Sequence, residues 1–125
     1  MKKIFRIAPS ILSANFSKLG QEINDVISSG ADIVHFDVMD NHYVPNLSFG
    51  PMVLNSLRND GITANINVHL MSENINVLIK HFAKAGANSI VFHPKTSDNI
   101  NKSISLIKSF NIEAILNFGS GLGLG

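Results

Sequence analysis

The 125-residue sequence contains no cysteine and no tryptophan, and it has only one tyrosine. Without cysteine there is neither a disulfide scaffold nor a thiolate metal site, so a metal ion would need histidine and carboxylate ligands. No apolar run approaches the roughly eighteen residues of a membrane-spanning helix. The 10 basic and 9 acidic residues nearly cancel, and the basic ones are scattered, which argues against a nucleic-acid-binding surface. We expect a single cytoplasmic domain without a targeting segment.

Strand-like and helix-like segments alternate along the chain. The two-residue alternation of a β-strand occurs at 5–9, 33–40, 65–71, 89–94 and 113–117. Between successive strands, apolar residues recur three or four positions apart, which is the spacing of one helix face. Strands separated by helices pair in parallel, so the pattern predicts repeated βα units and a parallel sheet.

Residue types at the expected helix boundaries support this interpretation. Ser17, Ser72 and Asp98 are predicted N-caps, because their side-chain oxygens can accept hydrogen bonds from the free N–H groups of a first turn. Pro51 suits the first position of another helix. The residues expected just after the helices tolerate a left-handed backbone, and they are Gly30, Gly61, Gly86 and Asn111.

The strands at 33–40 and 65–71 each combine an apolar face with a face that carries chemistry. The side chains sharing the second kind of face are His35, Asp37 and Met39 on one strand and Asn67, His69 and Met71 on the other. If these strands are parallel neighbours, two histidines and an aspartate converge near their carboxyl ends. That convergence fits either a metal site or a hydrogen-bonded polar cluster within the sheet, and the spacing does not separate the two.

The regular pattern stops at Asn117. Residues 118–125 contain four of the nine glycines, and glycine loses the most backbone entropy on ordering. We expect residues 1–117 to form the domain and residues 118–125 to be a flexible glycine-rich tail.

Several motifs follow one another in an order that points to a known family. They are APSILSANF at 8–16, HFDVMD at 35–40, VPN at 44–46, FGP at 49–51, HLM at 69–71, AGA at 85–87 and FH at 92–93. Together they closely resemble the ribulose-phosphate 3-epimerase family over about residues 6–117.

The resemblance implies an α/β fold in which the parallel βα repeats form the N-terminal half of a (β/α)₈ TIM barrel. The chain would be truncated, since a whole barrel usually needs about 250 residues. In the family, the second catalytic aspartate and the glycine-rich phosphate loops come from later strands, which this sequence does not contain. The competing fold is a five-stranded doubly wound sheet. An open half-barrel would leave strand edges through which a homo-oligomer could form.

The resemblance also implies an activity, the interconversion of D-ribulose 5-phosphate and D-xylulose 5-phosphate in the pentose phosphate pathway by proton abstraction at C3. Carried over, Asp37 is a catalytic acid/base, and His35, Asp37 and His69 are ligands of one divalent metal ion. Zinc is the first expectation, with iron, manganese or cobalt as alternatives. The residues expected to contact the substrate are Ser10, His69, Met39 and Met71.

The competing function is a non-catalytic remnant or interaction fragment of the same family. It follows from the missing second acid/base and phosphate loops, which leave one carboxylate and little remote binding energy. Preference for a pentulose or a hexulose phosphate stays open. His93–Pro94 is interpreted as a strand end, and His42 and His81 as surface or packing residues, because none of them matches a family ligand.

Overall fold

The computed structural model describes residues 3–7, 16–39 and 50–118, with only the backbone at 3–7, 16, 17 and 39. Its strands are β1 (Lys3–Ile7), β2 (Ala31–Met39), β3 (Ile66–Met71), β4 (Ser89–Phe92) and β5 (Glu113–Leu116). Its helices are α2 (Phe16–Ser28), α3 (Pro51–Asn59), α4 (Ile75–Ala85), α5 (Ile100–Lys108) and the short 3₁₀ turn η1 (Pro94–Thr96). All five strands are parallel and lie in chain order, β1-β2-β3-β4-β5.

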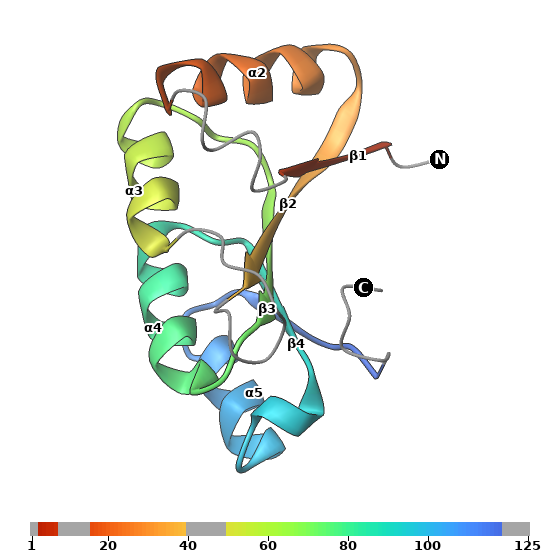
Figure 1. Cartoon of the computed structure of the whole chain (residues 1–125), viewed down its shortest axis with the longest axis vertical. Coiled ribbons are helices and arrows are strands. Elements are labelled where there is room, and N and C mark those ends of the chain that lie inside the picture. Colours follow the sequence, from red (N-terminus) through yellow and green to blue (C-terminus); the bar gives the residue numbers. More distant parts are fainter. Residues whose placement is uncertain (1–2, 8–15, 40–49, 119–125) are drawn as a thin grey trace.

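The helices cover one face of this sheet. Figure 1 shows α2, α3, α4 and α5 following one another along the same side. A doubly wound sheet has helices on both faces and a reversal in strand order, so that competing fold is wrong for the described part of the chain. The arrangement is the predicted half of a (β/α)₈ barrel. Among the described helices, none is long and apolar enough to cross a membrane.

The core lies between the sheet and the helices. Strands β2 and β3 turn alternate side chains toward it, so Phe36 of β2 and Val68 of β3, which are register partners, are both fully buried. The helices contribute the buried residues Leu19, Ile23, Val53, Leu54, Leu57, Ile75, Ile79, Phe82, Ala85 and Ile107. Val53, Leu54 and Leu57 form the inner face of α3. Ile100, the first residue of α5, is 36% exposed.

The predicted helix ends are confirmed by the backbone. The φ angles of Gly30, Gly61 and Gly86 are 111°, 93° and 117°, and Asn111 has a φ of 61°. Only a residue that tolerates the left-handed region can end a helix in this way without strain. Local residue chemistry was therefore sufficient to find these boundaries.

The predicted N-caps are wrong. Ser72 follows β3 directly, is fully buried and donates its hydroxyl to the Val38 carbonyl at 3.4 Å, while α4 begins after Asn74. The cap of α5 is Asn99, whose side chain accepts from the Lys102 N–H at 3.1 Å, one residue after Asp98. Helix α2 begins at Phe16, before Ser17. Short polar side chains can satisfy several neighbouring backbone groups, so residue type alone did not fix the cap.

Arg58, near the end of α3, connects the segments that lead into β3 and β4. Its Nε and Nη2 donate to the Gly86 carbonyl at 3.2 and 2.8 Å, and Nη2 also donates to Asn88 Oδ1 at 2.9 Å. Nη1 donates to the carbonyls of Ile62 and Ala64 at 2.9 and 2.8 Å. All the guanidinium N–H groups are thus used. Burial lowers the pKa of Arg58, yet an arginine stays charged at neutral pH.

Substitution of Gly86 tests how tightly the Arg58 side chain is packed. A Cβ at residue 86 would lie 2.8 Å from Arg58 Cγ, whereas one at residue 61 would meet nothing within 4 Å. Both glycines have positive φ, so alanine strains the backbone at either position. Gly61→Ala measures this strain alone, and we expect it to lower the free energy of unfolding by about 1–2 kcal/mol. We expect Gly86→Ala to lower the free energy of unfolding by about 1–3 kcal/mol more, since the hydrogen-bonded arginine cannot move aside freely. Urea unfolding followed by circular dichroism measures both; equal losses would contradict the packing argument.

Candidate functional site

The sheet face turned away from the helices carries polar side chains on neighbouring strands. In the register of β2 and β3, Asp37 is the partner of His69 and His35 is the partner of Asn67. The predicted parallel pairing of these two strands is therefore confirmed. Asp37 and His69 each lie two residues before the end of their strand, at the edge where active sites of parallel αβ folds are built.

Asp37, His69 and His93 form a chain of contacts, which we call the Asp–His–His cluster. Nδ1 of His69 lies 3.7 Å from Oδ1 of Asp37, and its Nε2 lies 3.0 Å from Nε2 of His93. The centroids of the two imidazole rings are 5.1 Å apart and their planes are inclined by 28°. Exposure is only 3% for His69 and 1% for His93, whereas Asp37 is partly accessible. One ring therefore bridges a carboxylate and a second ring.

His93 is the member of this cluster that sequence reasoning missed. It was interpreted as a strand end because it matches no family ligand, but it directly follows β4, the neighbour of β3. The alternation of side chains continues past Phe92, so His93 falls on the face that Ser89 and Val91 occupy. Extending the β4 pattern by one residue and pairing it with His69 would have found the contact.

The burial of His93 sets its electrostatics. Burial lowers the pKa of His93, and the nearby His69 lowers it further. Since an unperturbed histidine already titrates near 6.5, the ring of His93 is neutral at neutral pH. A neutral imidazole carries one N–H donor and one lone pair, so it can take either role toward His69.

This pKa predicts how stability depends on pH. The unfolded chain binds a proton at His93 near pH 6.5 and the folded chain only at lower pH, so folding stability falls as the pH drops below about 6.5. His69 contacts this ring and Asp37 lies beyond His69, so the contribution of His93 is isolated by comparing variants. The measurement is the urea midpoint of unfolding at several pH values between about 5 and 7.5. As the pH is lowered, this midpoint should fall less steeply in His93→Gln than in the wild type or in the exposed-site control His81→Gln. Parallel slopes would contradict the prediction.

The remaining predicted residues are described to different extents. Met71 ends β3, is 2% exposed and is the register partner of Met39, whose side chain is not described. Ser10 lies outside the described residues. Asn67 continues the polar row across the sheet, since its Nδ2 donates to Ser89 Oγ at 2.6 Å.

The donor chemistry of this face suits a divalent metal only in part. Asp37 and His69 supply a carboxylate and an imidazole on adjacent strands, which is the right type of ligand. Within residues 3–7, 16–39 and 50–118, however, no three histidine or acidic side chains lie close enough together to hold an ion. The described residues do not form a complete metal site, and the reaction is derived below from the side chains alone.

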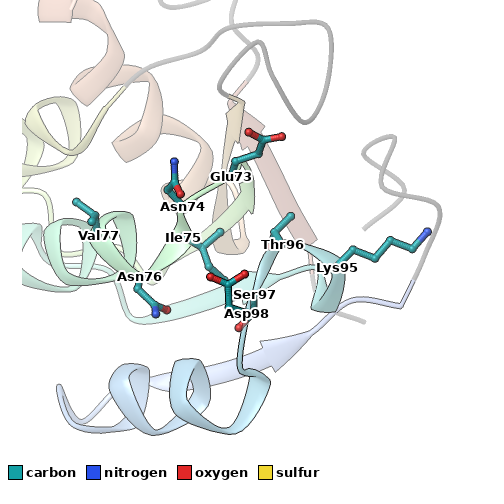
Figure 2. A pocket seen from close by; sticks show the side chains of 9 residues that line it. All are labelled: Glu73, Asn74, Ile75, Asn76, Val77, Lys95, Thr96, Ser97 and Asp98. Carbon is teal, nitrogen blue, oxygen red and sulfur yellow. The ribbon is translucent and has the colours of Figure 1, made fainter.

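A separate pocket of about 420 Å³ opens beyond the carboxyl ends of β3 and β4. Figure 2 shows that its lining comes from the start of α4 and from the segment around η1, with Lys95 extending away from the other side chains. Glu73 and Asp98 add carboxylates to this edge, but no member of the Asp–His–His cluster lines the pocket. It is therefore a neighbour of the cluster and not part of it.

Comparisons with known proteins agree with these features. The sequence model of the "Ribulose-phosphate 3 epimerase family" matches residues 6–123. The ribulose-phosphate 3-epimerase of Serratia marcescens is 56% identical over 118 residues, covering 94% of this chain and 56% of that protein. That of Escherichia coli K12 is 54% identical over 116 residues, covering 93% and 52%. The chain spans about half the length of these curated relatives.

A crystal structure of dihydropteroate synthase from Yersinia pestis superposes with a TM-score of 0.58. The superposition covers 92% of this chain and 39% of the synthase, at 14% sequence identity. At that identity the likeness concerns the fold alone. It supports the parallel βα architecture independently of the sequence motifs.

Proposed function

Because this chain belongs to the ribulose-phosphate 3-epimerase family, we propose that its sheet carries an acid/base centre for epimerisation at C3 of D-ribulose 5-phosphate and D-xylulose 5-phosphate. The observation that carries the proposal is the partly accessible carboxylate of Asp37, 3.7 Å from His69 and near the carboxyl ends of β2 and β3. Asp37 is the catalytic residue of this proposal.

The chemistry requires a base beside a carbon adjacent to a carbonyl. A carboxylate within hydrogen-bond reach can remove the C3 proton and return it. One carboxylate reaches one face of the carbon only, so inversion requires a second group on the opposite face. The Asp–His–His cluster contains one carboxylate. The described residues thus support proton exchange at C3 more directly than they support complete epimerisation, and impaired epimerisation is part of the proposal.

The remaining residue roles also belong to this proposal. Ser10, His69, Met39 and Met71 would contact the substrate. One divalent ion, zinc before iron, manganese or cobalt, would bind through His35, Asp37 and His69 and would polarise the substrate oxygens. Elemental analysis of the purified chain and of His35→Gln tests the metal assignment. Equal metal content in the two proteins would remove His35 from the ligand set.

A homo-oligomer and a cytoplasmic location are further parts of the proposal. Among the described strands, β1 pairs with β2 alone and β5 with β4 alone, which leaves one edge of each available for pairing. Light scattering of the purified chain at several concentrations measures its mass. We expect a mass above 13.6 kDa that falls on dilution; a concentration-independent mass of one chain would refute association.

The second candidate function is a non-catalytic family fragment. Two observations favour it, the single carboxylate of the cluster and the coverage of about half of each relative. Coupled formation of xylulose 5-phosphate and metal content, measured on one preparation, separate the candidates. The epimerase proposal predicts activity above background that disappears in Asp37→Asn and persists in Asp25→Asn, a control on the exposed side of α2. No activity in the wild type would favour the fragment.

A further inference from the structure

We propose that two copies of this chain close their sheets into one barrel, in which β5 of each copy pairs in parallel with β1 of the other and each copy contributes its Asp37 to one enclosed space. The closure itself follows from the sheet and its charges. Only the use of the two Asp37 carboxylates rests on the proposed function.

The two outer strands of the described sheet each leave one edge open. Among the described strands, β1 pairs with β2 alone and β5 with β4 alone. The backbone N–H groups of Glu113 and Asn117 donate to carbonyls of the β4 segment at 3.3 and 3.0 Å. Backbone groups alternate between the two sides of a strand, so those of Ala114 and Leu116 point to the outer edge. Such an edge is a template for one more strand.

The sheet face turned away from the helices is also partly open. Val91 and Ile115, which are register partners on this face, are partly exposed. On the helix side of β4, by contrast, Ile90 and Phe92 are fully buried. Ile33 of β2 is a further partly exposed apolar residue on the open face. A second copy presents the same residues, so two sheets closed around one space remove both faces from water.

A half-turn can relate the two copies. Because all five strands are parallel, a half-turn about an axis along the strands keeps every strand pointing the same way. β5 of the first copy then meets β1 of the second, and β5 of the second meets β1 of the first. We call each of these contacts a seam. With five strands from each copy the ring closes, and no strand edge remains.

The residues that begin the two outer strands carry opposite charges. β1 begins with Lys3, and β5 begins with Glu113, which is exposed. The starts of parallel strands in a closed sheet lie at the same rim, so Glu113 of each copy comes beside Lys3 of the other. Opposite charges on neighbouring strands stabilise their pairing, and like charges destabilise it. The charge pattern therefore favours a second copy of this chain as the occupant of both edges.

The second copy also supplies the group that the proposed reaction needs. Asp37 lies two residues before the end of β2, on the face turned away from the helices. The half-turn places the two Asp37 carboxylates near one rim and on opposite sides of the enclosed space. One carboxylate takes the C3 proton, the electron pair stays on the substrate as an enediolate, and C3 takes a proton from the other carboxyl group. Two copies can therefore invert a carbon at which one copy only exchanges hydrogen.

Charge reversal at the seam tests the interface on the full chain. Light scattering at several concentrations gives the dissociation constant of the pair. We expect this constant to rise about tenfold in Glu113→Lys and in Lys3→Glu, because like charges then meet at both seams. A mixture of the two variants has opposite charges at both seams, so it should recover the wild-type constant. The control Lys80→Glu, on the exposed side of α4, should leave it unchanged.

The masses decide whether the interface exists. A wild-type mass of one chain at all concentrations overturns the proposal. So does a mass that grows beyond two copies, because the ring then does not close. A mixture that stays as dissociated as its two components also overturns it, since a contact elsewhere on the surface would not respond to complementary charges at residues 3 and 113.

Activity measured on the same samples separates the interface from the proposed function. Epimerisation should follow the fraction of paired chains, whereas C3 exchange should not require pairing. When Asp37→Asn is added to one of the two mixed variants, epimerisation should be lost and exchange should fall by about half. Recovered pairing in the mixture without exchange or epimerisation would refute the proposed activity and leave the interface supported. Epimerisation by unpaired chains would overturn the role given to the second Asp37.

Discussion

Arg58→Met is expected to lower the free energy of unfolding by about 3–5 kcal/mol, because it leaves several buried or half-buried acceptors without their charged donor. These acceptors are the carbonyls of Gly86, Ile62 and Ala64. The exposed side-chain oxygen of Asn88 also loses the guanidinium, but it still accepts from the Ile66 N–H. Methionine keeps much of the length and the apolar stem, so the loss reports on hydrogen bonding and charge. Urea unfolding followed by circular dichroism measures it.

Two further variants serve as controls for this measurement. Arg58→Lys keeps the charge but offers a compact ammonium in place of a planar fork, so we expect it to lose an intermediate amount. Lys80→Met removes a cation from the exposed side of α4 and should change stability by less than about 0.5 kcal/mol. A loss in Arg58→Met no larger than that in Lys80→Met would contradict the assigned role.

Phe82→Ala should also destabilise strongly, by about 3–5 kcal/mol. Phe82 is fully buried in the core between α4 and the sheet, so removing its ring leaves a cavity that the surrounding side chains fill only in part. Chemical unfolding again gives the free energy.

Phe118→Ala is the matched control for this substitution. Phe118 is 79% exposed, so the same truncation removes almost no buried surface. We expect a change of less than about 0.5 kcal/mol. Similar losses at residues 82 and 118 would show that the helix-side core is not where the structure locates it.

Much of the fold followed from local patterns in the sequence. Alternation on the strand containing Phe36 assigned its core face, and positive-φ residues such as Gly30 and Asn111 marked helix ends. Each of these signals lies within a single short segment of sequence, so it can be recognised without knowing the rest of the fold. Helix starts were harder to predict from residue type. Ser72 could cap a helix but donates to the Val38 carbonyl instead, and the cap expected at Asp98 is made by its neighbour Asn99.

The functional face was only partly predictable. The proximity of Asp37 and His69 followed from treating their strands as parallel neighbours, which the register confirms. The contact between His69 and His93 depends on where β4 ends and on how the two rings are oriented, and no motif encodes that. Arg58 was missed for a related reason: its acceptors are backbone carbonyls, which any residue supplies.

Hydrogen exchange at C3 tests the central claim most directly, because it requires Asp37 and only one face of the substrate. Proton spectra of D-ribulose 5-phosphate in deuterated buffer should show the C3 hydrogen replaced by deuterium in the presence of the chain, faster than xylulose 5-phosphate accumulates. The exchange rate should fall at least about 100-fold in Asp37→Asn. Exchange at an unchanged rate in Asp37→Asn, or none with the wild type, would contradict the account.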